Sequence, residues 1–288
     1  MQATEKSLRV ILLGTGAPGP VLNRFGPSTL IEAGGEQFVF DAGRGAMQRL
    51  FQLGTRFAEN LFLTHLHSDH VVGLPDLWLT GWILGRAKPM RVWGPTGTKN
   101  MMSHLENAFE FDLRVRTHYP KEGAAVIAQD FTEGVVYERN GVKVTAFLVN
   151  HGDVKPAFGC RLDFAGRSVV LSGDTSFSEN LIRHAQGSDV LVLNVIVPEA
   201  FRAHATFHTP EQIDQTIPLH TTPQQAGEIF NRVKPRLALY SHISPPNVTD
   251  GEIVAHTRES YSGPLEVGSD LLTITVGEKV QVRPFGAR

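Results

Sequence analysis

The chain has 288 residues, of which 41% are hydrophobic and 19% are charged, a composition typical of soluble globular proteins. Its 27 Lys and Arg residues against 29 Asp and Glu residues leave a net charge of −2, which excludes the broad basic surface of many nucleic-acid-binding proteins. The single cysteine, Cys160, excludes a disulfide framework and a cysteine-based zinc site. No apolar run has the length of a membrane-spanning helix, so we expect a soluble, cytoplasmic protein.

Short apolar runs rich in β-branched residues alternate with helix-like segments along the chain, which predicts mixed β-sheets covered by helices. Asn140-Gly141 and Ala165-Gly166 each separate two such runs and predict hairpins. No long linker or repeat interrupts the pattern, so we expect a single domain over residues 1–288. The predicted strands cover 8–13, 36–40, 60–63, 90–93, 142–149, 158–164, 167–171, 189–195, 237–240 and 271–276, and the predicted helices cover 43–54, 76–85, 98–109 and 222–233.

The segment GTGAPG (14–19) matches the glycine pattern of dinucleotide-binding sites and follows a predicted strand. Such a site needs a helix that starts inside the motif, so that its amides face the pyrophosphate. Pro18, Pro20 and Pro27 prevent a helix here. We therefore interpret the segment as a tight loop and not as a nucleotide site.

Three histidines and an aspartate follow another predicted strand, in the segment THLHSDH (64–70). Alternate residues of an extended chain point to opposite faces, so His65 and His67 can share an ion only if the strand has ended and the loop curls. A solvated histidine-rich loop would not explain the aspartate or the H-x-H-x-D-H spacing. The segment therefore predicts a metal site.

Further ligand-type residues stand beside other predicted elements. His151, Asp174 and His242 each follow a predicted strand, and His220 precedes a predicted helix. Active sites of layered α/β proteins collect at strand ends, because the loops converge there. The candidate metal ligands are His65, His67, Asp69, His70, His151, Asp174 and His242.

This set of imidazoles and carboxylates is sufficient for two cations, and zinc suits both ligand types, with manganese or iron as alternatives. Two ions roughly 3.5–4 Å apart can hold a bridging hydroxide as nucleophile and neutralise charge on substrate oxygens. The residue types therefore predict metal-assisted hydrolysis with two Zn²⁺ per chain.

The segment LFLTHLHSDHVVGLP, the later His151, the sequence SGDT (172–175) and the final His242 together resemble the metallo-β-lactamase fold superfamily. The resemblance starts at LGTGAP and FDAG near the N-terminus and covers most of the chain. It implies an αββα sandwich, an α/β fold whose two mixed sheets carry the site along one edge. It further implies that His65, His67 and His151 hold one zinc, that Asp69, His70 and His242 hold the second, that Asp174 bridges them and that Asp41 supports the ligands.

Within the superfamily, the chain is similar to the ribonuclease Z branch and its relatives with arylsulfatase or phosphodiesterase activity. His220, in HTTPQQA, resembles the histidine that protonates the leaving group in that branch, and we assign it and Asp69 to the catalytic groups. The interval between His151 and Asp174 is too short for the tRNA-clasping arm of that branch. In addition, Asn194 stands where a glutamate usually orients the histidine, and ISPPN (243–247) replaces the usual sequence after the last ligand.

Four side chains outside the metal set are candidates for substrate binding. Trp78 and Trp82 lie four residues apart on one face of a predicted helix, where they either pack in the core or form the floor of a pocket for an aryl group. His204 and His208 lie in the segment 198–219, which we interpret as a lid or a dimer contact. We interpret the remaining basic cluster, Arg86, Lys88 and Arg91, as solvated, with attraction of an anionic ester as the alternative.

These observations favour a binuclear zinc hydrolase of small anionic esters, either aryl sulfates or phosphodiesters. The expected partner is a small-molecule ester without nucleic acid or membrane, and a homodimer is a further expectation. The alternative is a ribonuclease Z-type tRNA 3′-end endonuclease, and lactone or β-lactam hydrolysis also stays open. An iron-dependent oxidoreductase and a non-catalytic scaffold are the alternatives from other classes.

Overall fold

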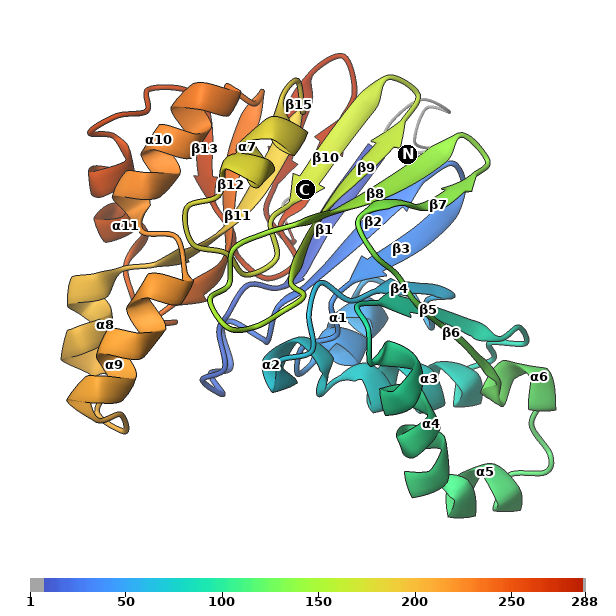
Figure 1. The fold of residues 1–288 in the computed structure, drawn as a ribbon. Helices are drawn as coiled ribbons and strands as arrows, with labels where there is room; N and C mark the ends of the chain where they lie inside the picture. Colours follow the sequence, from blue (N-terminus) through green and yellow to red (C-terminus); the bar gives the residue numbers. More distant parts are fainter. Residues whose placement is uncertain (1–7, 287–288) are drawn as a thin grey trace.

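The computed structural model describes residues 8–286. Two β-sheets pack face to face, and helices cover the outer face of each (Figure 1). Aromatic side chains from both sheets fill the space between them: Phe62 stacks on Trp93 with ring centroids 4.7 Å apart, and Tyr137 from the opposite sheet meets Phe38 edge-on at 5.2 Å. This is the αββα sandwich that the sequence predicts.

The first sheet has the order β15-β14-β1-β2-β3-β4-β5-β6 within the described residues. Its strands from β15 to β3 pair antiparallel, and those from β3 to β6 pair parallel, so the carboxyl ends of the strands from β3 to β6 lie at the same edge of the sheet. The strands are β1 (Leu8–Gly14), β2 (Ser28–Ala33), β3 (Glu36–Phe40), β4 (Asn60–Phe62), β5 (Met90–Gly94), β6 (Val126–Asp130), β14 (Thr273–Val276) and β15 (Val280–Arg283).

The second sheet has the order β13-β12-β11-β10-β9-β8-β7 in the part of the chain that the structure describes. Both predicted hairpins are confirmed: Asn140 and Gly141 join β7 to β8, Ala165 and Gly166 join β9 to β10, and all four have the positive φ of a type I′ turn. The strands are β7 (Gly134–Arg139), β8 (Val142–Leu148), β9 (Phe158–Phe164), β10 (Arg167–Leu171), β11 (Val190–Ile196), β12 (Leu237–Ser244) and β13 (Leu265–Val267).

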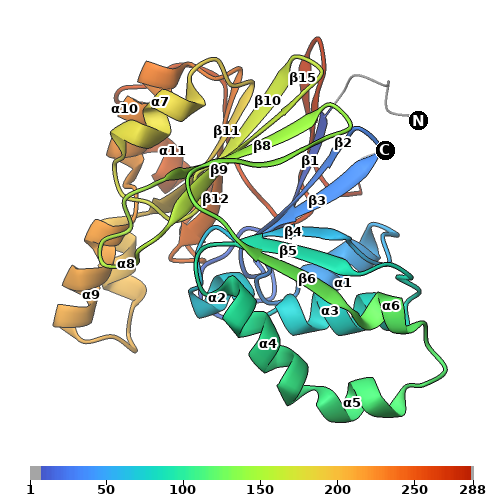
Figure 2. The same ribbon diagram turned by 45° about the vertical axis from the view of Figure 1, so that its right-hand side comes forward.

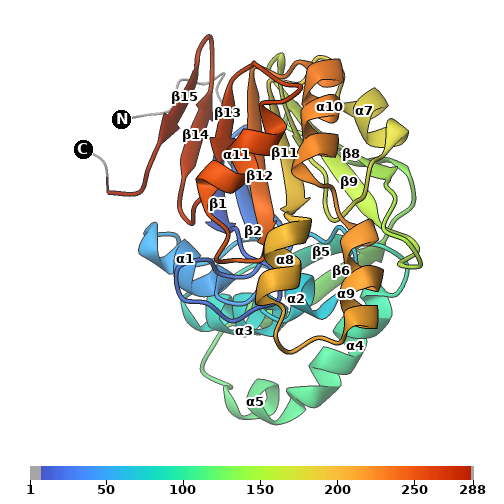
Figure 3. The same cartoon turned by 90° about the vertical axis from the view of Figure 1, so that its left-hand side faces the viewer.

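The helices form the two outer layers. Those numbered α1 to α6 lie beside the first sheet, and α4 and α5 extend beyond β6 (Figure 2). Helices α7, α10 and α11 cover the second sheet, whereas α8 and α9 project below it (Figure 3). The helices are α1 (Ala46–Gln52), α2 (Ser68–Val71), α3 (Leu74–Ile83), α4 (Thr98–Ala108), α5 (Glu110–Val115), α6 (Lys121–Ala124), α7 (Glu179–Ala185), α8 (Pro198–His204), α9 (Pro210–Thr216), α10 (Pro223–Val233) and α11 (Asp250–Thr257).

The GTGAPG segment forms no helix, as expected from its prolines. Strand β1 ends at Gly14, and the chain then folds back tightly against residues 24–26. A Cβ atom on Gly14 would collide with the carbonyl oxygen of Gly26, and one on Gly16 with that of Arg24. The glycines are therefore explained by backbone packing and not by a phosphate ligand.

Arg86 corrects one expectation, because it is completely buried rather than solvated. Its guanidinium donates hydrogen bonds to the carbonyl oxygens of Leu77 (3.3 Å), Trp78 (2.6 Å) and Gly123 (3.0 Å). Burial lowers the pKa of Arg86 to about 10, which still leaves it charged at neutral pH. The side chain thus joins the middle of α3 to α6.

Arg86→Met is expected to lower the free energy of unfolding by about 3–5 kcal/mol, because it removes three buried hydrogen bonds from a charged donor. Denaturant unfolding followed by circular dichroism measures this loss. Lys88→Met is the control: the Lys88 side chain is 74% exposed, and its replacement should change the stability by less than about 0.5 kcal/mol. Equal effects of the two substitutions would contradict a structural role for Arg86.

Candidate metal centre

All seven candidate metal ligands meet at one edge of the sandwich, between the two sheets. The segment after β4 supplies His65 and His67, and α2 supplies Asp69 and His70, so these four belong to the first sheet's side. The others come from the second sheet: His151 follows β8, Asp174 follows β10, and His242 lies within β12. We predicted that His242 follows its strand, but it lies within β12. Its backbone has a φ of 46°, and it lies beside a register shift between β11 and β12.

Three imidazole nitrogens converge in the first group. His67 Nδ1 lies 3.1 Å from His65 Nε2 and 3.3 Å from His151 Nε2. Asp174 Oδ2 closes the group at 3.9 Å from His65 Nε2 and 3.8 Å from His151 Nε2. The two histidines of the H-x-H pattern can face the same point because the strand has ended at Phe62 and the loop curls back.

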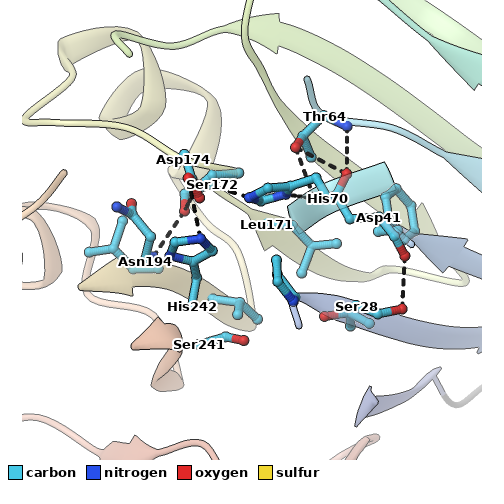
Figure 4. Close-up of a pocket in the computed structure, with 16 residues that line it drawn as sticks. Ser28, Asp41, Thr64, His70, Leu171, Ser172, Asp174, Asn194, Ser241 and His242 are labelled. Carbon is cyan, nitrogen blue, oxygen red and sulfur yellow. Dashed lines mark hydrogen bonds and ion pairs between the residues drawn. The ribbon is translucent and has the colours of Figure 1, made fainter. Parts of the chain in front are cut away.

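The second group shares the same carboxylate (Figure 4). Asp174 Oδ2 lies 3.4 Å from His70 Nε2 and 3.3 Å from His242 Nε2. Asp69 Oδ2 lies 3.2 Å from His242 Nε2 and 3.7 Å from His70 Nε2. One oxygen of Asp174 is therefore a neighbour of both groups.

These separations fit metal coordination. Four ligands at the 2.0–2.1 Å of zinc–nitrogen bonds lie about 3.3–3.4 Å apart along the edges of a tetrahedron. Imidazole nitrogens that face one another at such distances repel when both present lone pairs, and a cation between them removes the repulsion. His70 Nε2 is buried and has no hydrogen-bond partner in residues 8–286, as expected of a nitrogen reserved for a metal. The donor set thus fits two cations of zinc type.

Hydrogen bonds behind the ligands fix the orientation of the rings. Asp41 has a left-handed backbone with φ 60°, and its carboxylate accepts hydrogen bonds from the backbone and hydroxyl of Thr64. Such outer contacts set the tautomer and the basicity of a ligating histidine. The ring contacts are His65 Nδ1 with Thr64 Oγ1 (3.1 Å), His70 Nδ1 with Asp41 Oδ2 (2.9 Å) and His151 Nδ1 with the carbonyl oxygen of Leu219 (3.0 Å).

The electrostatics of the centre favour a cation. Burial alone would raise the pKa of Asp174 and Asp69, but the imidazoles of His242 and His70 hold both below their usual range. Burial alone would lower the pKa of His70 and His242, and the Asp174 carboxylate instead raises both. Burial lowers the pKa of His65, and the nearby His70 lowers it further. The carboxylates therefore favour positive charge beside them.

His220 lies next to this centre, with its Nδ1 3.9 Å from Asp174 Oδ2. Asn194 Nδ2 lies 3.2 Å from His220 Nδ1, while Asn194 Oδ1 accepts from the Thr175 backbone N–H at 3.3 Å. That second bond directs the NH₂ group toward His220, so Nδ1 accepts and Nε2 carries the proton of the neutral ring. Burial lowers the pKa of His220 to about 4.

Asn194→Asp is expected to raise the pKa of His220 by about 1–3, because a carboxylate then faces Nδ1 and favours the imidazolium. An NMR titration of the chelator-treated protein measures the change. The pKa of His220 lies below neutrality in the unchanged protein. A higher pKa should therefore increase the fraction of His220 that is charged near pH 6. Asn194→Leu is the control and should leave the pKa low; equal values in the two variants would contradict the contact.

The structure corrects the substrate-binding assignment of the two tryptophans. Trp78 is fully buried and Trp82 is 1% exposed, both in the core beneath α3. Their indole N–H groups donate to the carbonyl oxygens of Ala124 and Pro120, so neither ring is free to contact a substrate. Core packing, the other interpretation of their spacing, explains them.

The segment 198–219 forms α8, α9 and a 3₁₀ turn, Ile217–Leu219, and leads directly to His220. His204 and His208 are exposed on it and have no contact with the metal centre in the described structure. The backbone of Leu219, which the sequence did not single out, supports the His151 ring. Thr64 was also missed, although it precedes the histidine motif directly.

Residues 36–243 match a known family, described as the beta-lactamase superfamily domain. The chain belongs to the metallo-β-lactamase superfamily. It is 33% identical to a protein named Ribonuclease Z from Mycolicibacterium gilvum, over 97% of this chain and 100% of that protein. The predicted metal-dependent hydrolase is thereby confirmed.

Solved structures agree with the fold. A metallo-β-lactamase fold protein from Bacillus subtilis superposes with a TM-score of 0.73 at 16% identity, covering 94% of this chain and 100% of that chain. The short form of human tRNase Z gives a TM-score of 0.67 at 20% identity, covering 92% and 98%. No helix within residues 8–286 is long and apolar enough to cross a lipid bilayer.

The expected partner, a small-molecule ester with no nucleic acid, is wrong. The relatives that share a third of the sequence along nearly its whole length are named as ribonucleases. The short interval between His151 and Asp174 does not distinguish this chain from the relatives named Ribonuclease Z. The 291-residue alignment covers 97% of this chain and all of the relative, so the relative contains no long arm that this chain lacks.

Proposed function

We propose that this protein is a ribonuclease Z-type endonuclease that cleaves precursor tRNA at the 3′ end of the tRNA. The main support is its 33% identity to a protein named Ribonuclease Z, over 97% of this chain. The geometry agrees, since two ligand groups share the Asp174 carboxylate and a further histidine lies beside them. Two adjacent metal sites are typical of enzymes that hydrolyse phosphodiesters.

In this proposal the metal ligands divide into two sets around Asp174. His65, His67 and His151 would hold one zinc, and Asp69, His70 and His242 would hold the other. Bound there, the zinc ions would activate a water molecule and offset the charge of the scissile phosphate. The low pKa of Asp69 and Asp174 keeps both carboxylates ionised at neutral pH, as binding of a cation requires.

His220 is the proposed proton donor to the departing ribose oxygen. Its Nδ1 faces Asn194, so its Nε2 is the nitrogen that carries a transferable proton. Because the pKa of about 4 leaves His220 largely neutral at pH 7, the imidazolium would be a minor species there. Asn194 therefore orients the ring without charging it, unlike a carboxylate at the same position.

We expect close to two zinc ions per chain in protein purified without chelator. The expectation rests on the seven ligand-type residues brought together at one edge. Elemental analysis by mass spectrometry gives the count and the identity of the metal. Chelator treatment should abolish RNA cleavage, and zinc should restore it. A count near zero, with no activity gained on adding zinc, manganese or iron, would contradict the two-metal centre.

The substrate is tested with a precursor tRNA that carries a 3′ trailer. A matched unstructured RNA of equal length and the same trailer is the control for non-specific hydrolysis. The proposal predicts one cut, at the junction of the tRNA and its trailer, and no comparable cut in the control. Equal cleavage of both RNAs, or scattered cuts in the precursor, would contradict it.

The assay should be run at more than one salt concentration. The net charge of −2 provides little general attraction to a polyanion, so specific contacts near the centre must supply most of the affinity. We therefore expect KM to rise with salt less steeply than for a strongly basic RNA-binding protein.

A further inference from the structure

A small cavity lies between the two sheets, directly beneath the metal centre (Figure 4). It has a volume of about 40 Å³, and polar and apolar side chains line it from both sheets. Thr29 of β2 and Ser241 of β12 face it from opposite sheets, and they are 6% and 8% exposed. Neither hydroxyl has a hydrogen bond to another group of residues 8–286, so the cavity wall offers free donors and acceptors.

His242 differs from the other buried ligand histidines. The rings of His65, His70 and His151 each have a protein group that contacts the nitrogen turned away from the centre. His242 lines the cavity, and its Nδ1 is buried without a hydrogen-bond partner among the described residues. Asp174, which lines the same cavity, has its Oδ1 buried in the same unpartnered state.

These two atoms require opposite kinds of partner. His242 Nε2 faces Asp69 and Asp174, so a cation bound at Nε2 leaves the proton of the neutral ring on Nδ1, which then needs an acceptor. Asp174 Oδ1 needs a donor. Water can satisfy both, whereas an anion can only accept and a cation can only be coordinated. A cavity of about 40 Å³ has room for two or three waters at roughly 10–15 Å³ each, and none for an organic ligand.

We propose that this cavity is a built-in water site, in which ordered water accepts the Nδ1–H of His242 and orients that ring toward its metal ion. Thr29 and Ser241 are positioning residues that hold the water from opposite sheets. The inference rests on the proposed two-metal centre. It adds a hydrogen-bond acceptor for His242 Nδ1, which has none among the described protein groups. Outer partners of this kind typically change metal affinity 10–100-fold when they are removed.

Two substitutions fill the cavity from opposite walls, Thr29→Ile and Ser241→Val. Both should weaken binding of the second zinc ion by about 10–100-fold and leave the first ion within about twofold. Competition against a chelator of known affinity, in protein first stripped of metal, measures both steps. Ser244→Val is the matched control, because Ser244 is buried on the same strand β12 but does not line the cavity. It should change neither step.

Agreement between the two variants matters, because Ser241 is next to His242 in the chain and Thr29 is not. An effect of Ser241→Val alone would mean a disturbed backbone and would overturn the water site. Unchanged binding in both variants, or equal weakening of both ions, would overturn it as well. Unaltered protein that binds no zinc would instead contradict the proposed function itself.

A crystal structure of the zinc-loaded protein provides a test that needs no variant. The expected result is a water within about 3.2 Å of His242 Nδ1, inside the cavity. A protein acceptor at Nδ1, or a dry cavity, would overturn the inference even if both filled variants failed to fold.

Discussion

Replacement of Asp174 by alanine is expected to remove the second zinc ion and to weaken the first. A single oxygen of this side chain lies within 3.3–3.9 Å of a nitrogen from each of four ligand histidines, two in each group, and within the described residues no other side chain links the two groups in this way. Its loss also leaves His70 and His242 without the carboxylate that raises their pKa. We expect RNA cleavage to fall by about 10³-fold or more, since metal binding and charge stabilisation are lost together.

Metal content and cleavage rate should be measured on the same preparation. Asp174→Asn is the informative companion, because it keeps the size of the side chain and removes only its charge. Asp189→Asn is a control: Asp189 directly precedes β11, where it binds Ser168 and Arg236 and belongs to no candidate metal group of the described residues, and its replacement should leave the metal content at the original value. Full zinc occupancy in Asp174→Ala would refute the shared role of Asp174.

Replacement of His220 by alanine is expected to preserve both zinc ions and to slow RNA cleavage by about 10²–10⁴-fold, the usual contribution of a general acid. The reason is chemical: a ribose oxygen departs poorly without a proton. A good leaving group such as p-nitrophenolate departs as the anion. Hydrolysis of bis-p-nitrophenyl phosphate, used here as a chemical probe, should therefore change little in the same variant.

The competing role for His220 is that of a ligand, because His220, His242 and Asp174 also lie close enough to share an ion. The two roles differ in their readouts. A ligand would be revealed by loss of zinc and by equal slowing of both substrates. His204→Ala is a suitable control, since His204 is exposed on α8 and lies outside the groups that can hold a metal in the described structure.

The sequence predicts the fold, through its local pattern and its resemblance to the superfamily, and it indicates which ligand-type residues gather at one edge. Apolar runs bounded by glycine mark the strands, and the ligand-type residues stand near their ends. The position of His242 within β12 could not be predicted, since the register shift beside Asn194 and the left-handed backbone of His242 depend on pairing with another strand.

Long-range contacts and the burial of side chains could not be predicted from the sequence either. The spacing of Trp78 and Trp82 shows that they share a helix face, but not whether that face meets the core or a substrate. The contact between His151 and the Leu219 carbonyl joins residues far apart in the chain and leaves no mark in composition or spacing. The net charge of the whole chain also led to the wrong partner, because a net charge of −2 does not describe the charge around a small site.

The division of the ligands between the two sheets has a consequence for the stability of the whole molecule. Each ligand group includes residues from both sides of the sandwich, so an ion held there cross-links the two halves much as a clamp would. If zinc binds there as proposed, the free energy of unfolding depends on free zinc and increases by about 2.7 kcal/mol when its concentration reaches a hundred times the dissociation constant. Scarcity of zinc would therefore reduce the amount of folded protein as well as its activity.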